Sequence, residues 1–485
     1  MTRSATAILT LLAFVAVLLT IAAWAARRTH SAADFAVSNR RQGVWLTALS
    51  YSANAVNAWM LLFFGAAAFA WGWSAAWIWG GVMFGCIVNL WFVAPRLRSA
   101  SAGGQGGMTL IQVLSADAGD RMQPLVVRSA VFILTLALLL QVGALLRSAA
   151  AVLIADFGFE LDVIVMTAVV LITICVFAGG LRAASACDAV QTVVVLAVVL
   201  FLPLPALIAI GGWQELFGAI AALGPQATDW FGGKNGVVAV AFASGVGGIG
   251  LVLCGQPHVL NRFMAARDEA TLRKARWLAL AWVATLLGAA LMCGWCASVL
   301  YSGLERPQLA LFALAERLLP PSLAAFIVIA LLVAIISNVG SQLLVLSTSL
   351  AVDLRRATAP LSLPLMRTGL VVAAILACCV AFYTPSGVLD QAIFAFHALG
   401  ASFGPLLLVR LSNKRIRPGS TLGAMWAGFV LSFLFHLLPD APGDFLERVL
   451  PFIAALGIAL TGGERRRNPD RADRGQETVH DRVPI

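Results

Sequence analysis

Residues 45–70 read WLTALSYSANAVNAWMLLFFGAAAFA, an apolar run with polar side chains at its middle. Those side chains are Ser50, Tyr51, Ser52, Asn54 and Asn57. A second run, residues 237–257, reads VVAVAFASGVGGIGLVLCGQP and holds four glycines within six positions. Polar groups are costly inside a membrane, and glycine clusters allow a helix to break. Both runs therefore predict helices that unwind at mid-membrane and offer backbone carbonyls and amides to a ligand.

The composition of the whole chain is that of a membrane protein. Of its 485 residues 60% are hydrophobic and 12% charged, against about 25% charged in soluble domains. Thirteen apolar runs are long enough to cross a hydrocarbon core about 30 Å thick. Their predicted bounds are 5–25, 45–70, 73–95, 126–154, 161–178, 188–211, 237–257, 276–302, 322–352, 366–384, 388–410, 420–438 and 447–463. Continuously apolar runs exclude a membrane β-barrel, so residues 1–463 are predicted to form an all-α, polytopic transmembrane domain.

The formal net charge of +10 is interpreted as an orientation signal. Of the 33 Lys and Arg residues, 27 fall on one side of the predicted helices and five on the other. The 27 include Arg262, which we assign to a loop over residues 262–276. Because cytoplasmic loops carry the excess of Lys and Arg, we expect a cell-membrane protein with its N-terminus outside and its C-terminus in the cytoplasm. The tail, residues 464–485, is predicted to be cytoplasmic and disordered.

The two interrupted runs are five helices apart. Helices two to six cover about 45–211 and helices seven to eleven about 237–410, and each group begins with its interrupted member. This order predicts a five-plus-five inverted repeat with a binding site between the halves. Glycine is also common where transmembrane helices pack closely, so the glycines of 237–257 have a packing explanation as well.

Several motifs resemble the solute:sodium symporter family. Gly-Gln-Pro-His at 255–258, followed by Phe-Met-Ala-Ala at 263–266, closely resembles the sodium/proline symporter branch, and GGLRAASACDAVQ at 179–191 is similar to a family loop that leads into a helix. Further matches lie at residues 46–50 with Trp59, 341–345 and 402–405. The resemblance implies the thirteen-helix version of the broken-helix, inverted-repeat fold.

The resemblance also implies a sodium site between the unwound second helix and the ninth helix. Its expected ligands are the carbonyls of Ala53, Val56 and Ala334, the hydroxyl of Ser337 and the amide oxygen of Asn338. The family has Thr at the position of Asn338, and the proline branch has Asp at the position of Ala55. We find no Asp or Glu in the middle third of any predicted helix, so a cation is expected to meet five neutral ligands.

The substrate is predicted to lie between the second and seventh helices. The candidate residues are Asn54, Asn57, Gly248, Ile249, Leu253 and Pro257. Helix ends at the breaks offer unpaired amides to a polar or anionic group, and aliphatic side chains line the rest. The proline branch has aromatic residues at the positions of Ile249 and Leu253, which favours a larger or more apolar solute than proline here.

Three charged residues each have two interpretations. Asp188 either caps the start of a cytoplasmic helix or takes part in gating. Arg40, which matches a family arginine at the inner mouth, is either a gating residue or one of the orientation charges. Arg147 is the one Lys or Arg that we place inside a predicted span. It either snorkels to the outer interface or faces the bundle and pairs with a substrate carboxylate or a polar partner.

The function implied by the resemblance is secondary active transport: sodium-coupled symport of a small organic solute into the cell. An amino acid or related carboxylate is expected, with proline-like solutes included. The alternatives are a solute sensor and a sodium-independent carrier built on the same fold. We find no metal-ligand cluster, nucleotide loop or nucleophile with base partners in the sequence, so an enzyme is not expected. The expected partners are the solute, a sodium ion and membrane lipid, without nucleic acid.

Overall fold

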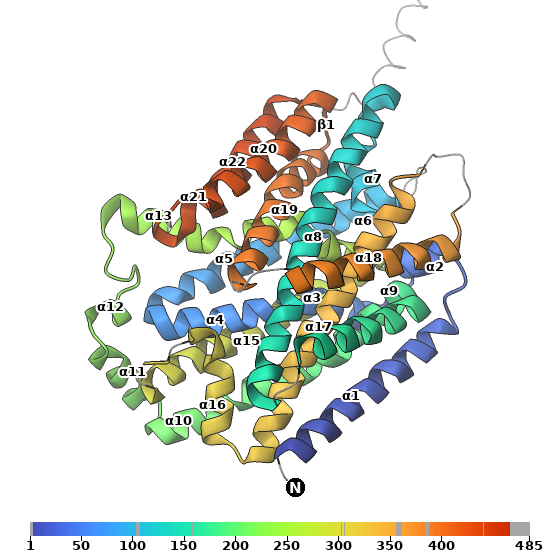
Figure 1. Cartoon of the computed structure of the whole chain (residues 1–485). Helices are drawn as coiled ribbons and strands as arrows, with labels where there is room; N and C mark the ends of the chain where they lie inside the picture. The colour runs from blue at the N-terminus through green and yellow to red at the C-terminus, as the bar shows by residue number, and fades with distance from the viewer. Residues whose placement is uncertain are drawn as a thin grey trace, which may run out of the picture.

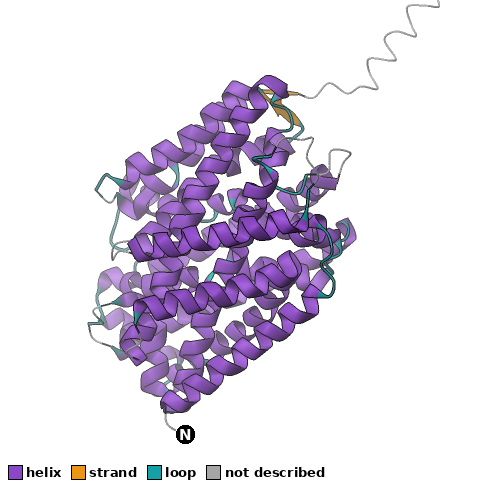
Figure 2. Ribbon diagram, turned by 45° about the vertical axis from the view of Figure 1, so that its right-hand side comes forward, coloured by secondary structure: helices purple, strands orange, loops and turns teal. Residues whose placement is uncertain are grey.

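The computed structural model describes residues 3–102, 107–157, 160–301, 303–304, 306–355, 361–383, 388–439 and 441–465. These residues form an almost wholly helical molecule (Figure 1, Figure 2). The helices are α1 (Arg3–Ala26), α2 (Ala32–Val37), α3 (Val44–Ala55), α4 (Ala58–Trp71), α5 (Ala76–Ile87), α6 (Ala94–Ala102), α7 (Leu110–Ser115), α8 (Gly119–Phe157), α9 (Leu161–Phe201), α10 (Pro203–Ile210), α11 (Trp213–Ala222), α12 (Pro225–Thr228), α13 (Gly236–Gly248), α14 (Pro257–Ala265), α15 (Glu269–Leu300), α16 (Ala310–Leu318), α17 (Pro321–Val352), α18 (Leu363–Tyr383), α19 (Val388–Leu411), α20 (Pro418–His436), α21 (Phe445–Arg448) and α22 (Leu450–Thr461). Strands β1 (Lys414–Ile416) and β2 (Gly463–Arg465) pair antiparallel and join the start of α20 to the end of α22. From residue 466 onward, the tail that we predict to be disordered lies outside the described residues.

Ten helical runs in the described part of the chain are long and apolar enough to cross a membrane. Two of them, Trp59–Ala102 and Leu161–Ile210, have 44 and 50 residues, which is more than twice the roughly 20 residues that one crossing needs. Each contains a glycine with positive φ, Gly72 in the first and Gly180 in the second. A multi-pass helical membrane protein is therefore confirmed, whereas the thirteen helices and the five-plus-five repeat stay predictions.

Gly180 kinks α9 and corrects one predicted boundary. Its φ of 53° and ψ of −141° suit glycine alone, and a Cβ there would lie 2.5 Å from the carbonyl oxygen of Phe35 in α2. The helix resumes directly after this glycine and continues to Phe201. The gap predicted between residues 178 and 188 is wrong, because residues 181–187 are helical. Asp188 consequently lies about two turns inside a helix and does not cap its start.

The predicted interruption of residues 45–70 is present between α3 and α4. The helix ends at Ala55, Val56 leaves the helical region with φ −114° and ψ 73°, and Asn57 begins the next helix. The side chain of Asn57 caps α4 by accepting a hydrogen bond from the backbone N–H of Met60 at 3.2 Å. The last carbonyls of α3 lose their helical partners at this break, so they are free to face a ligand.

The predicted interruption of residues 237–257 is also present. Helix α13 ends at Gly248, the chain continues as a 3₁₀ turn over Leu251–Gly255, and Pro257 occupies the first turn of α14, where its missing N–H costs nothing. Gln256 holds the break against α19, because its Nε2 donates to the carbonyl oxygen of Phe396 at 2.7 Å.

The glycines before this break serve close packing on two sides. A Cβ on Gly250 would lie 1.7 Å from the carbonyl oxygen of Gly81 in α5, and one on Gly245 would lie 2.3 Å from that of Gly443. A Cβ on Gly248 would meet the Val449 side chain at 2.6 Å. The packing explanation that the sequence left open therefore holds for these glycines.

Replacing Gly81 with valine is expected to prevent folding, because its Cβ would lie 2.2 Å from the carbonyl oxygen of Gly247, a backbone atom that cannot move aside. The neighbouring Gly80 is the matched control, since a Cβ there meets nothing within 4 Å and valine has the same helix propensity at both positions. The yield of monodisperse protein on size exclusion measures the difference. Equal yields of the two valine variants would show that α5 and α13 are not in backbone contact.

Candidate functional site

A small cavity of about 20 Å³ lies beside the break between α3 and α4. Its lining comes from five helices and the break itself: Ala53, Val56, Leu61, Asp188, Gln191, Thr192, Val195, Leu286, Ala334, Ser337 and Asn338. We call it the break cavity. All five residues expected to hold sodium line it, although they come from segments almost 300 residues apart. A cavity of this size has room for about one water or one small cation.

Asp188 also lines the break cavity, which corrects the expectation of wholly neutral ligands. One carboxylate oxygen, Oδ1, accepts a hydrogen bond from Ser337 Oγ at 3.0 Å. The other, Oδ2, accepts from Ser50 Oγ at 2.9 Å and from Asn54 Nδ2 at 2.8 Å. The carboxylate thus joins α9 to α3 and α17. Burying a charged group is costly unless it is hydrogen-bonded, and these donors offset that cost.

Arg262 supplies the countercharge of Asp188. Its guanidinium is fully buried, with Nη2 2.8 Å from Asp188 Oδ2 and Nε donating to Ser50 Oγ at 3.0 Å. Nη2 also donates to the hydroxyl of Ser341. We assigned Arg262 to a cytoplasmic loop, and that assignment is wrong: α14 carries it into the interior of the molecule. Arg147 is consequently not the one basic residue within the helical bundle.

Asp188 and Ser337 offer oxygen atoms of the kind that bind cations, and the Arg262 guanidinium lies directly beside them. Asp188 Oδ2 faces the guanidinium, whereas Oδ1 faces Ser337, which lines the break cavity. Carboxylate, hydroxyl and carbonyl oxygens are the ligands of hard cations. These residue types therefore suit a small monovalent cation, although Arg262 already balances the charge of Asp188 and adds no attraction for one.

Asn338 has its amide oxygen occupied. Its Oδ1 accepts a hydrogen bond from Gln342 Nε2 at 2.7 Å, one turn further along α17. Its Nδ2 has no hydrogen-bond partner among the described residues. An amide oxygen has two lone pairs, so Oδ1 can still face a cation with the second.

The six residues predicted to bind substrate do not line one cavity. Asn54 is bound to Asp188, Asn57 caps α4, and Gly248 packs against Val449. Ile249 and Leu253 are fully buried, and the carbonyl oxygen of Leu253 accepts a hydrogen bond from Asn89. Pro257 lines a second cavity, described below. The roles of these residues in substrate binding stay predictions.

An aromatic group that our substrate prediction left out lies directly after the first break. The Trp59 ring is 5.4 Å from that of Phe396 in α19 and 6.2 Å from that of Phe63, between ring centroids. Trp59 Nε1 and Asn57 Nδ2 are buried without a hydrogen-bond partner in the described part of the chain. A ligand or an ordered water would satisfy these two donors. Trp59 was visible in the sequence as a family match, but its contact with α19 was not.

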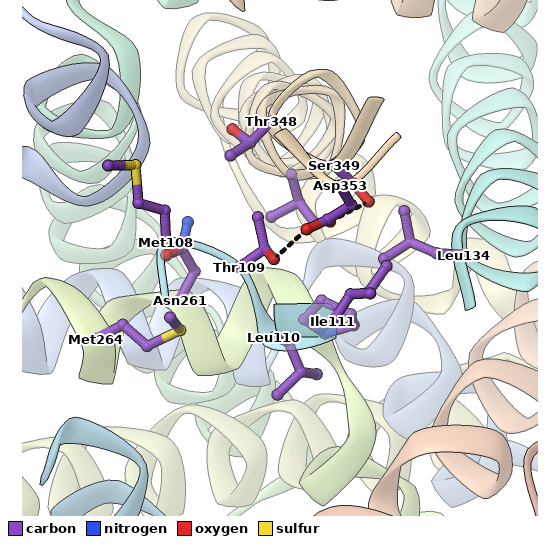
Figure 3. Close-up of a pocket in the computed structure, with 12 residues that line it drawn as sticks. Met108, Thr109, Leu110, Ile111, Leu134, Asn261, Met264, Thr348, Ser349 and Asp353 are labelled. Carbon is purple, nitrogen blue, oxygen red and sulfur yellow. Dashed lines mark hydrogen bonds between the residues drawn. The ribbon is translucent and has the colours of Figure 1, made fainter. Parts of the chain in front are cut away.

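The second cavity, also about 20 Å³, lies at the C-terminal end of α17 (Figure 3). Asp353 follows the last residue of that helix and joins it to α7: Thr109 Oγ1, which caps α7, donates to Oδ1 at 2.6 Å, and Ser349 Oγ donates to Oδ2 at 2.8 Å. Pro257 and Asn261 of α14 complete one wall. Burial raises the pKa of the Asp353 carboxyl to about 7.

The protein is expected to lose stability as the pH rises from about 4 to about 7 through Asp353. The unfolded carboxyl loses its proton near 3.8, whereas the folded one keeps it until about 7, so folding binds a proton in that window and stability falls with rising pH. Asp353→Asn removes this dependence. Thermal unfolding of the purified protein at pH 5 and pH 8 measures it, with Asp120→Asn, an exposed carboxylate of α8, as control. If the unfolding temperatures of the wild type and Asp353→Asn differ by the same amount at both pH values, the raised pKa of Asp353 would be contradicted.

The two remaining predicted residues lie outside the break cavity lining. Arg40 has a φ of 54° and donates from Nη2 to the carbonyl oxygens of Ser101 and Gly107. Arg147 donates from Nη1 to the carbonyl oxygens of Ala381 (3.2 Å) and Phe382 (3.4 Å), at the end of α18. A cation at a helix C-terminus is favourable, which gives Arg147 a structural explanation. Gating by Arg40 and substrate pairing by Arg147 stay predictions.

A multi-pass helical bundle with two interrupted helices and a cation-sized cavity beside one of them fits the architecture of an ion-coupled membrane transporter. Residues 35–430 match the model of the sodium:solute symporter family, and the chain belongs to this family. The resemblance found in the motifs is therefore confirmed. The protein is a transporter-family membrane protein and not an enzyme.

The relatives of this chain are transporters. It is 28% identical over 480 residues to the osmoregulated proline transporter OpuE of Bacillus subtilis, covering 95% of this chain and 94% of that one. It is 29% identical to the high-affinity proline transporter PutP of the same organism, covering 89% and 94%. Among solved structures, a Na⁺-coupled sialic acid symporter in a substrate-bound, outward-open state matches with a TM-score of 0.80 at 16% identity, covering 96% and 99%. That last likeness shows the fold alone.

Proposed function

We propose that this protein imports a small organic solute by sodium-coupled symport, with sodium bound in the break cavity. In this proposal Ala53, Val56 and Ala334 contribute carbonyl oxygens, and Ser337 and Asn338 contribute side-chain oxygens. The proposal includes thirteen helices, the inverted repeat, an outside N-terminus and a cytoplasmic C-terminus.

One observation carries the sodium assignment. The residues that the family resemblance implies for sodium, on α3, its break and α17, line a single ion-sized cavity together with Asp188. A cavity of about 20 Å³ that is lined by a carboxylate and by a serine suits a small hard cation. The membership of a sodium:solute symporter family points the same way.

The solute that we propose is an amino acid or related carboxylate, with proline as the first candidate. The relatives OpuE and PutP are named proline transporters. Ile249 and Leu253 argue against an aromatic wall on the second broken helix, but Trp59 and Phe396 form one beside the first break. In this proposal the proline ring would pack against these aromatic side chains, with its polar groups near Asn57.

A sodium-independent carrier is the second candidate, and Arg262 favours it. The guanidinium already neutralises Asp188 from inside the protein, so the carboxylate does not need an external cation in order to stay buried. The two candidates differ in whether transport follows the sodium gradient.

Uptake into proteoliposomes tests the proposal. Labelled proline, other amino acids and small organic acids are offered with an inward sodium gradient and with potassium in its place. We expect proline or a close analogue to accumulate only with sodium. Accumulation that is equal in potassium would support the sodium-independent carrier, and no uptake across the whole panel would favour a sensor.

A further inference from the structure

A basic cavity lies at the C-terminal end of α1, away from the break cavity. Its volume is about 500 Å³, and its lining includes Arg27, Arg28, His30, Arg41, Arg182 and Trp24. We call it the arginine cavity. Four arginines and a histidine come from three parts of the chain, the end of α1, the segment before α3 and the middle of α9. Their convergence on one space is more than an excess of positive charge in loops requires.

The arginine heads are available to a ligand. Arg27, Arg28 and Arg41 are exposed, and no acidic residue is among those that line the cavity. The nearest described countercharge is Asp34, whose Oδ1 is 4.0 Å from Arg182 Nη2. One carboxylate near four guanidinium groups leaves a large positive potential in the cavity.

The cavity lies where a lipid headgroup would lie. Helix α1 packs along one edge of the molecule beside α9 (Figure 1), and only 17% of its most apolar window is buried by protein. The remaining apolar surface of α1, with Leu12 58% exposed, is therefore expected to face acyl chains. At its end Trp24 is 41% exposed and lies under the guanidinium of Arg28, 4.8 Å from the ring centroid. Tryptophan beside arginine at the end of an apolar helix is typical of the membrane–water interface.

We propose that the arginine cavity binds the phosphate headgroup of an anionic phospholipid whose acyl chains lie along α1. Guanidinium groups bind phosphate oxygens in pairs of hydrogen bonds, and basic pockets between transmembrane helices suit lipid phosphates. A free phosphate would use the same arginines but gain nothing from the apolar face of α1. The lipid assignment does not depend on the solute or on sodium.

A headgroup bound in the arginine cavity would contact α9, the helix that carries Asp188. Gln42 lines the arginine cavity and donates from Nε2 to Ser185 Oγ at 2.9 Å. Arg182, Ser185 and Asp188 lie on successive turns of the same helical segment after Gly180. Anionic lipid is therefore expected to bias the position of this segment and, through it, uptake.

The test is lipid binding to the purified full-length protein in a neutral detergent. Dioleoylphosphatidylglycerol and dioleoylphosphatidylcholine are titrated separately, and the rise in the unfolding temperature gives an apparent affinity. Arg27→Gln, Arg28→Gln and Arg41→Gln are combined in one variant. Each basic side chain near a lipid surface is worth roughly five-fold in affinity, so this variant should bind phosphatidylglycerol roughly a hundred-fold more weakly.

The matched control removes three exposed basic residues elsewhere: Arg121→Gln, Arg273→Gln and Lys274→Gln. It should bind phosphatidylglycerol as the wild type does. If the glutamine variant fails to fold, the corresponding triple lysine variant keeps the charge and should still bind more weakly than the wild type, because it loses paired hydrogen bonds.

Three results would overturn the proposal. They are unchanged affinity in the glutamine variant, an equal loss in the control, and equal stabilisation by phosphatidylcholine. A titration with glycerol 3-phosphate distinguishes a lipid phosphate from a soluble phosphate. Stabilisation by this free anion at the same concentration as the lipid would assign the cavity to a soluble phosphate and would refute lipid binding.

Discussion

Replacing Arg262 with glutamine is expected to abolish uptake and to destabilise the protein by about 3–5 kcal/mol, because it leaves the carboxylate of Asp188 buried without its countercharge. The two groups are 2.8 Å apart, and both side chains are almost wholly removed from solvent. Thermal unfolding of the purified variant measures stability, and proteoliposome uptake measures transport. Arg262→Lys keeps the charge but not the fork of donors to Ser50 and Ser341, so an intermediate loss is expected.

The double variant Asp188→Asn with Arg262→Gln separates stability from function. Removing both charges takes away the unpaired buried group, so much of the stability should return. Uptake should not return, because the cavity has lost its one carboxylate. A double variant that is less stable than Arg262→Gln alone would show that Asp188 and Arg262 are not each other's main partner.

Ser337→Ala is expected to weaken the apparent sodium affinity of uptake by roughly ten-fold, the lower end of what losing a group at a metal site costs. Ser337 lines the break cavity and its hydroxyl donates to Asp188 Oδ1 at 3.0 Å, so the substitution removes a proposed ligand and takes away one donor to that carboxylate oxygen. Asn338→Thr should keep or improve the affinity, since a threonine hydroxyl would not be engaged by Gln342 as the amide oxygen is.

Ser347→Ala is the matched control for this series. It makes the same substitution on the same helix at a buried hydroxyl, which donates to the carbonyl oxygen of Leu344 and lies outside the break cavity lining. Its sodium dependence should match the wild type. Uptake that ignores sodium in the wild type and in Ser337→Ala alike would mean that the cavity holds no coupling ion.

The sequence predicted the elements of this fold better than their contacts. Both helix breaks follow from local signals, polar side chains in the first and glycine with Gln-Pro in the second, and both are present. The members of the break cavity could be chosen because the resemblance pairs the second helix with the ninth. Local signals carry no such information for the six substrate residues, which the fold distributes among different neighbours.

Arg262 and Asp188 were misplaced for one physical reason. A charged residue costs less in a loop than in a bundle, so charge was used to end helices. The pair removes that cost by mutual contact between α14 and α9, although Asp188 and Arg262 lie 74 residues apart in sequence. Neither residue alone shows that its partner exists, and α14 is too short and too polar for the apolar pattern to include it.

The glycine contacts of α13 and of the residues just after it limit the ways in which this molecule can move. Side chains at an interface can exchange rotamers and let two helices slide, but the Gly250–Gly81 and Gly245–Gly443 contacts are between backbones. Two segments in backbone contact have no rotamers to exchange. They are therefore expected to separate or to move together, and not to slide past each other. Helix α5, helix α13 and the turn before α21 are therefore expected to move as one rigid unit when the molecule changes conformation.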